Sequence, residues 1–112
     1  MSRLWVVLIL GCVGATAQTN PGNAEHGKRL YLKNGCYQCH GQSGQGGLAG
    51  ARLAQTKLTQ AAFIAYLRNP APGGMPPYRA QVMTDEELTD ILTYIKTFPE
   101  PAPAKSIPLL NP

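Results

Sequence analysis

The chain has 112 residues, a length that fits one domain rather than two. Its formal net charge of +4 at pH 7 is too small to indicate nucleic-acid binding, although it permits attraction towards an acidic partner surface. Three cysteines and two histidines limit the side chains that could hold a metal or a redox cofactor.

Residues 1–17 have the pattern of a secretory signal peptide, with Arg3 before an apolar run and a cleavage site at residues 15–17 (Ala-Thr-Ala). The apolar run is shorter than the roughly 20 residues needed to cross a bilayer, so no membrane span is expected. Cys12 is a less favoured alternative, as the site of a lipid anchor. Both interpretations take the chain out of the cytoplasm, and we expect a periplasmic protein.

The mature chain should then contain one domain at residues 18–98 and a Pro-rich tail at residues 99–112. Removal of the signal peptide also removes Cys12, so the mature chain keeps Cys36 and Cys39. We expect a cofactor to use both thiols, and no disulfide to form even in an oxidising compartment.

The first helix is predicted from Ala24 to Asn34, with Gly35 as its stop. Leu30 and Tyr31 provide its apolar packing. Gly27 costs about 1 kcal/mol relative to alanine inside a helix. A close approach of another helix would offset that cost, whereas a tolerated glycine near the helix start is an equally good local explanation.

Residues 36–40 read Cys-Tyr-Gln-Cys-His, the attachment signal for a c-type haem. Thiols at Cys36 and Cys39 can each form a thioether with one haem vinyl group, and His40 then falls under the iron as its proximal ligand. A thioredoxin-type dithiol is disfavoured because no strand pattern lies nearby. A zinc site is disfavoured because no second Cys/His pair has suitable spacing.

The stretch 41–58 is rich in glycine and polar residues, so it should form a loop that wraps one edge of the haem. A second helix is predicted from Gln60 to Arg68, capped by Thr59 and ended by Pro70. Its apolar face should contain three residues, which are Phe63, Tyr66 and Leu67.

A second irregular segment at residues 71–78 combines glycines and prolines and contains Met75. A thioether sulfur suits haem iron, so Met75 is the expected distal ligand opposite the proximal histidine. Met83 is a weaker candidate because it is placed to pack against the following helix. His26 and an open sixth position are the remaining alternatives.

The last helix begins after Thr84, which forms a capping box with Glu87. Met83 and Leu88 flank the cap as a hydrophobic staple. Pro99 ends the helix. Its expected buried stripe contains Leu88, Ile91, Leu92 and Ile95, joined by Tyr94 and Phe98. The tail beyond should be extended or mobile, and the apolar residues that could dock from it are Ile107, Leu109 and Leu110.

The order of helix, CxxCH, Gly-rich loop, helix, Arg-Asn-Pro, Met-Pro-Pro-Tyr and capped helix resembles a small bacterial class I cytochrome c with one haem. The resemblance covers about residues 24–98. It implies an all-α fold whose N- and C-terminal helices cross beside a covalently bound haem c. It also implies axial ligation by His40 and Met75. Gly27 and Tyr31 should then meet the last helix at that crossing, at Ile91 and Tyr94.

One feature departs from the family pattern. Many members place a proline after the Gly-rich loop, and the carbonyl of that proline orients the proximal histidine. Residues 48–53 contain no proline, so the sequence does not identify the hydrogen-bond acceptor for His40.

These features predict a periplasmic one-electron carrier rather than an enzyme. It could be free, or a haem subunit or partner of a periplasmic dehydrogenase or oxidase, and its partners should be a redox donor and a redox acceptor. The alternative is a haem enzyme or sensor with a labile sixth ligand, although no distal acid or histidine is evident for peroxide chemistry. Basic residues that could steer an acidic partner are Lys28, Arg29, Lys33, Arg52, Lys57, Arg68 and Arg79.

Overall fold

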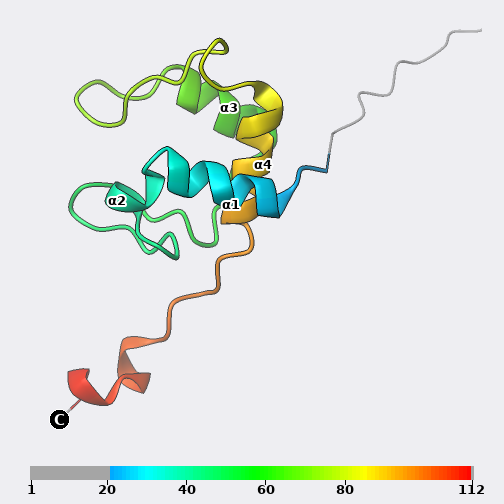
Figure 1. The fold of residues 1–112 in the computed structure, drawn as a ribbon. Coiled ribbons are helices and arrows are strands. Elements are labelled where there is room, and N and C mark those ends of the chain that lie inside the picture. The colour runs from blue at the N-terminus through cyan, green and yellow to red at the C-terminus, as the bar shows by residue number, and fades with distance from the viewer. Residues whose placement is uncertain (1–20, 112) are drawn as a thin grey trace, which may run out of the picture.

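The computed structural model describes residues 21–111, so the signal-peptide and Cys12 interpretations lie outside the described residues. It contains four α-helices, α1 (Ala24–Lys33), α2 (Cys36–His40), α3 (Gln60–Arg68) and α4 (Asp85–Ile95), shown in Figure 1. No strand occurs between residues 21 and 111, which agrees with the all-α class I cytochrome c fold expected from the sequence. None of the helices in this range is long and apolar enough to span a bilayer.

Helix α1 ends one residue earlier than predicted. Asn34 has left the helical conformation (φ −89°, ψ 4°), and its side chain donates to the carbonyl of Leu30 at 2.9 Å. Gly35 follows with a φ of 70°, in the left-handed region that glycine enters without strain. The predicted stop at Gly35 therefore turns the chain directly from α1 into α2.

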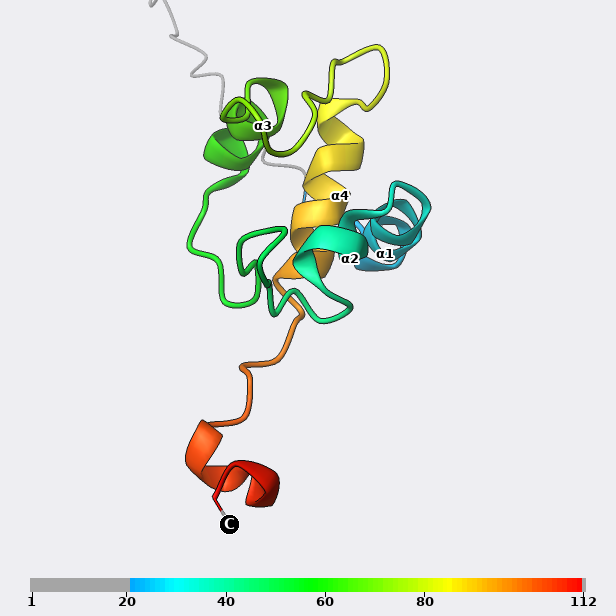
Figure 2. The ribbon, with the colours of Figure 1, turned by 90° about the vertical axis from the view of Figure 1, so that its left-hand side faces the viewer.

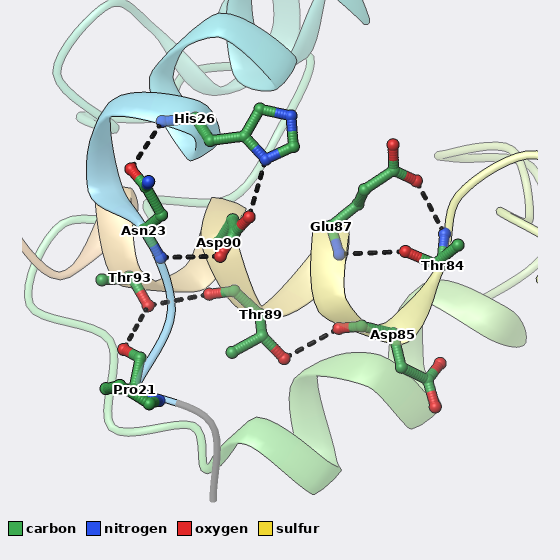
Figure 3. Close-up of polar contacts among 9 residues, drawn as sticks. All are labelled: Pro21, Asn23, His26, Thr84, Asp85, Glu87, Thr89, Asp90 and Thr93. Carbon is green, nitrogen blue, oxygen red and sulfur yellow. Dashed lines mark hydrogen bonds and ion pairs between the residues drawn. The ribbon is translucent and has the colours of Figure 1, made fainter.

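Helix α4 begins with the predicted capping box (Figure 3). The backbone N–H of Glu87 donates to Thr84 Oγ1 at 3.2 Å, and the N–H of Thr84 donates to Glu87 Oε2 at 2.8 Å. Both bonds satisfy backbone donors that the first turn of a helix leaves without partners. The acidic first turn also complements the positive end of the helix dipole.

Helices α1 and α4 cross in close contact, as the resemblance implied (Figures 1 and 2). A β-carbon placed on Gly27 would lie 1.9 Å from the carbonyl oxygen of Asp90 and 2.9 Å from the backbone nitrogen of Ile91. Beside this contact the ring of Tyr31 packs edge-on against Tyr94, with 5.5 Å between the centroids. The crossing therefore needs a residue without a side chain at position 27.

Polar contacts hold the outer side of this crossing (Figure 3). The carboxylate of Asp90 on α4 accepts from the backbone N–H of Asn23 at 2.6 Å, and its other oxygen lies 2.7 Å from His26 Nδ1. Thr93 bonds to the carbonyl of Pro21 at 3.3 Å. His26, which the sequence left as an alternative iron ligand, is therefore placed at the helix crossing as a partner of Asp90.

The hydrophobic core forms where α1, α3 and α4 pack together. Met83 and Leu88 are both buried in it, as the predicted hydrophobic staple requires. The predicted face of α3 is correct for Phe63 and Leu67 but wrong for Tyr66, a residue that is 51% exposed. The remaining buried apolar residues of the core are Leu30, Tyr31, Ala54, Ile91, Leu92, Ile95 and Phe98.

The tail leads away from the four helices (Figures 1 and 2). It is less extended than predicted, because it forms two short 3-10 turns at Ala104–Ser106 and Pro108–Leu110. The Asn111 side chain donates to the carbonyls of Ala104 and Ile107, which closes these turns on themselves. Leu109 and Leu110 are exposed, so the docking that the sequence left open is not seen in this structure.

Gly27→Ala should destabilise the haem-loaded protein, because the added methyl group meets backbone atoms that cannot rotate away. Overpacking of this kind costs about 2 kcal/mol or more, which exceeds the gain of about 1 kcal/mol in helix propensity. Denaturant unfolding measures the change. Gly47→Ala is the matched control, since a β-carbon there meets nothing within 4 Å. Equal stability of the two variants would contradict the close approach of α1 and α4.

Candidate functional site

Helix α2 carries the two thiols and the imidazole within little more than one turn. Both cysteines are free thiols, with Cys36 partly buried and Cys39 exposed. Burial raises the pKa of the Cys36 thiol. The helix ends at Gly41, whose carbonyl accepts a hydrogen bond from the buried phenol of Tyr31 at 2.7 Å. Helix α1 therefore fixes the end of the segment that carries Cys36, Cys39 and His40.

The imidazole of His40 is oriented by a backbone carbonyl. Its Nδ1 lies 2.7 Å from the carbonyl oxygen of Ala51. Because a carbonyl only accepts hydrogen bonds, Nδ1 must carry the proton, and the lone pair of Nε2 remains available for a metal. Ala51 thus takes the role that a proline carbonyl has in many family members. Sequence reasoning missed it because the contact uses a backbone atom.

The Gly-rich loop brings Ala51 back to α2. The N–H of Gly46 donates to the carbonyl of His40 at 2.8 Å. Gly50 approaches so closely that a β-carbon there would lie 2.7 Å from the carbonyl oxygen of Cys39. The loop is held from its other side by Gln55, which donates to the carbonyl of Phe98 at 3.1 Å. The loop therefore supports the imidazole of His40 from its backbone.

Met75 lies in the long connection between α3 and α4, where its side chain is partly buried against the core. The connection is attached to the end of α3 at Tyr78, whose N–H donates to the carbonyl of Leu67 at 2.8 Å. Arg68 donates to the carbonyls of Tyr78 and Met83, each at 2.7 Å, and pairs with Asp85. The sequence grouped Arg68 with the basic residues that could steer a partner, whereas the structure shows its guanidinium bonded within the fold.

Tyr78 relates the Met75 segment to α2. The pKa of its phenol is raised first by burial and then by the neighbouring thiols of Cys36 and Cys39. Met75, Tyr78 and Cys36 are all partly buried against the same core cluster, so the Met75 segment and α2 pack on one shared core. Partly buried apolar side chains from α2, α3, α4 and both loops pack against the core, namely Cys36, Tyr37, Leu53, Ile64, Met75, Tyr78 and Tyr94.

This set of residues fits a haem. It offers two thiols for covalent attachment, an imidazole with a free Nε2, a thioether sulfur, and partly exposed apolar surface that a porphyrin could cover. Met83, the weaker candidate for the distal ligand, is 3% exposed and lies within the core cluster. His26 lies at the α1–α4 crossing, paired with Asp90.

Comparison with known proteins identifies the family of this chain. Residues 22–95 match the family described as cytochrome c oxidase, cbb3-type, subunit III. The chain is also similar to cytochrome c-555 of Methylococcus capsulatus, with 31% identity over 93 residues that cover 80% of this chain and 75% of that protein. No solved structure gives a significant match.

Tyr31→Phe should reduce stability near neutral pH by about 1 kcal/mol, because the carbonyl of Gly41 loses its donor. Burial raises the pKa of Tyr31 from 10.0 to about 12. The stability that depends on the neutral phenol is therefore fully present below pH 10 and is lost as the pH rises towards 12. Denaturant unfolding of the haem-loaded protein across this range should show a steeper loss for wild type than for Tyr31→Phe.

Tyr66→Phe is the matched control, since this phenol is exposed on the outside of α3. It should leave both the stability and its pH dependence unchanged. Identical alkaline profiles for wild type and Tyr31→Phe would show that the Tyr31 hydroxyl does not link α1 to the end of α2.

Proposed function

Because this chain belongs to the family of small c-type cytochromes that carry one covalently bound haem, we propose that it works as a one-electron carrier in the periplasm. Bound haem supplies an iron that exchanges one electron between its ferrous and ferric states. The chain contributes attachment, axial ligation, burial and charge. It performs no chemistry on a substrate.

Each site residue has one role in this proposal. Cys36 and Cys39 would form the two thioethers that attach the haem, and His40 Nε2 and the Met75 sulfur would hold its iron. The observation that carries the proposal is the hydrogen bond from His40 Nδ1 to the Ala51 carbonyl, beside the two cysteines. That bond holds the imidazole in the tautomer and orientation that a proximal ligand requires. With Met75 as sixth ligand, no iron position remains for a substrate.

The proposed location and domain limits follow from the sequence. Residues 1–17 would direct export and be removed, and residues 18–98 would form the haem domain, followed by the tail at 99–112. Donor and acceptor are proposed to be redox proteins. The matching family is described as an oxidase subunit, which supports an oxidase as one candidate acceptor, either as a transient partner or as a permanent complex.

Electrons would pass through an edge of the haem near the surface, because a domain this small cannot cover the whole macrocycle. Lys33 lies at the end of α1, three residues before Cys36, and its side chain is exposed. Lys28 and Arg79 are also exposed. These cations can attract an acidic partner to the haem-bearing side of the molecule, where contact times are short and long-range forces set the encounter rate.

The ligand assignment gives the first test. The oxidised protein should show the weak long-wavelength absorption band of a ferric iron–sulfur bond. Met75→Ala should abolish this band and open the iron to added ligands, because Met83, the other methionine of the α3–α4 connection, is buried in the core. Met83→Ala is the matched control, and it should keep the band while losing about 2–5 kcal/mol of stability through the cavity left in the core.

The opposite pattern, a band that survives Met75→Ala and disappears in Met83→Ala, would reassign the ligand. A wild-type ferrous protein that binds carbon monoxide readily would favour the alternative function, a haem enzyme or sensor with a labile sixth ligand.

Electrostatic steering gives the second test. Attraction between exposed charges is screened over about 10 Å at 0.1 M salt. The bimolecular rate of electron transfer with an acidic partner should therefore fall as salt is added. Lys33→Glu should lower the rate at low salt only, as measured by stopped-flow absorbance over an ionic-strength series.

Lys105→Glu is the charge-matched control, because it makes the same change in net charge on the tail instead of beside α2. It should lower the rate less than Lys33→Glu does. A rate that stays flat or rises with salt would remove the steering proposal, and would indicate apolar docking or a permanent complex.

A further inference from the structure

We propose that Arg68 is the positioning residue for the distal ligand, and that its hydrogen bonds determine how long the sixth position of the iron stays closed. This inference rests on the proposed function, in which Met75 supplies that ligand. Arg68 is the last residue of α3, and its side chain is 18% exposed. It acts through the chain that carries Met75 and is not itself a ligand.

The guanidinium connects three points along the segment that leads from α3 to α4. Its Nη1 donates to the carbonyl oxygens of Tyr78 and Met83, both at 2.7 Å. Its Nη2 pairs with the carboxylate of Asp85 in the first turn of α4. A planar guanidinium has several fixed donors, so one side chain can hold all three partners at once. The end of α3 is thereby joined to both the Met75 segment and the start of α4.

The segment around Met75 has few means of holding itself in place. Four of its residues lack a backbone N–H and cannot donate to a turn or ladder, which are Pro70, Pro72, Pro76 and Pro77. Tyr78 supplies the missing anchor. Its N–H donates to the carbonyl of Leu67, and its own carbonyl accepts from Arg68. Both backbone groups of Tyr78 are thus bonded to the end of α3.

The anchor at Tyr78 is transmitted to Met75 by a stiff connection. Only Pro76 and Pro77 separate the two residues, and each proline ring fixes its φ near −65°. The other side of Met75 is much less constrained. Gly73 has a φ of 83°, and a β-carbon there would meet nothing within 4 Å. Met75 is therefore positioned from its C-terminal side, through Tyr78 and Arg68.

This arrangement predicts the cost of opening the site. Displacement of Met75 by an added ligand requires the segment to swing away, and the short proline connection passes that movement to Tyr78. The hydrogen bond from Arg68 to Tyr78 must then break or strain. Hydrogen bonds to a charged donor are stronger than neutral ones. Loss of Arg68 should therefore make opening more frequent, even at temperatures where the fold is intact.

The test uses the full-length, haem-loaded protein with Arg68→Met, which keeps much of the apolar stem and removes the donors. Stopped-flow absorbance measures the rate at which imidazole binds the ferric protein. We expect that rate to rise by about tenfold or more and the long-wavelength iron–sulfur band to weaken. The covalent haem content should match that of wild type.

Gln60→Ala is the matched structural control. Gln60 on α3 donates to Thr89 on α4 at 2.8 Å, so its loss weakens the same pair of helices without touching the Met75 segment. It should reduce thermal stability while leaving the imidazole rate and the absorption band at wild-type values. An equal acceleration in Gln60→Ala would show that general destabilisation, rather than positioning, explains the effect.

Arg68→Lys keeps the test decisive if Arg68→Met does not fold. A lysine can donate to one or two of the three partners but cannot reproduce the planar fork, so its imidazole rate should lie between those of wild type and Arg68→Met. Wild-type rates in every folded Arg68 variant would overturn the inference.

Met75→Ala separates the two proposals: if it keeps the band, the ligand assignment has failed. If it loses the band while Arg68 variants bind imidazole slowly, only the role of Arg68 has failed.

Discussion

The close contact between α1 and α4 at Gly27 is the constraint on which the rest of the structure depends. With the carbonyl of Asp90 in the space where a side chain would stand, the two helices can bring Tyr31 into the core. Tyr31 in turn reaches the end of α2 through its hydroxyl. The crossing thus fixes the position of the two thiols and the imidazole, although neither Gly27 nor Tyr31 is a candidate ligand.

In the proposed haem site, the proximal side at His40 and the distal side at Met75 are supported in different ways. On the proximal side, the Gly-rich loop folds back until the Ala51 carbonyl meets His40, and Gln55 and Phe98 tie that loop to the end of α4. On the distal side, Pro-rich chain cannot form such a backbone network, so a side chain does the work. The guanidinium of Arg68 provides the hydrogen bonds that hold this Pro-rich segment, whereas the Gly-rich loop is held by hydrogen bonds from its own backbone amides.

This division suits an electron carrier. A metal that changes oxidation state with little rearrangement needs ligands that stay in place in both states, and each proposed ligand here has its own attachment to a helix end. The haem adds covalent links and a large apolar surface to a chain whose own core is small. The protein and its cofactor are thus expected to depend on each other for stability.

The sequence alone identified the features that depend on residues close to one another along the chain. The CxxCH segment, the Thr59 and Thr84 caps and the bounds of α3 are specified by residues within a few positions of one another, and the structure agrees with the caps and bounds. Spacing on a helix also identified most of the buried stripe of α4. It failed for Tyr66, because the width of the buried face depends on what packs against the helix.

Only the tertiary structure decided how distant segments support the ligands. The acceptor for His40 is a backbone carbonyl eleven residues away, and every residue type offers the same carbonyl, so no residue type marks it. From the sequence, Arg68 could only be classed as a charged surface residue. Its three hydrogen-bond partners lie ten to seventeen residues further along the chain, so no local pattern identifies them. Short-range patterns report helix ends and faces, whereas contacts between loops depend on where the helices bring them.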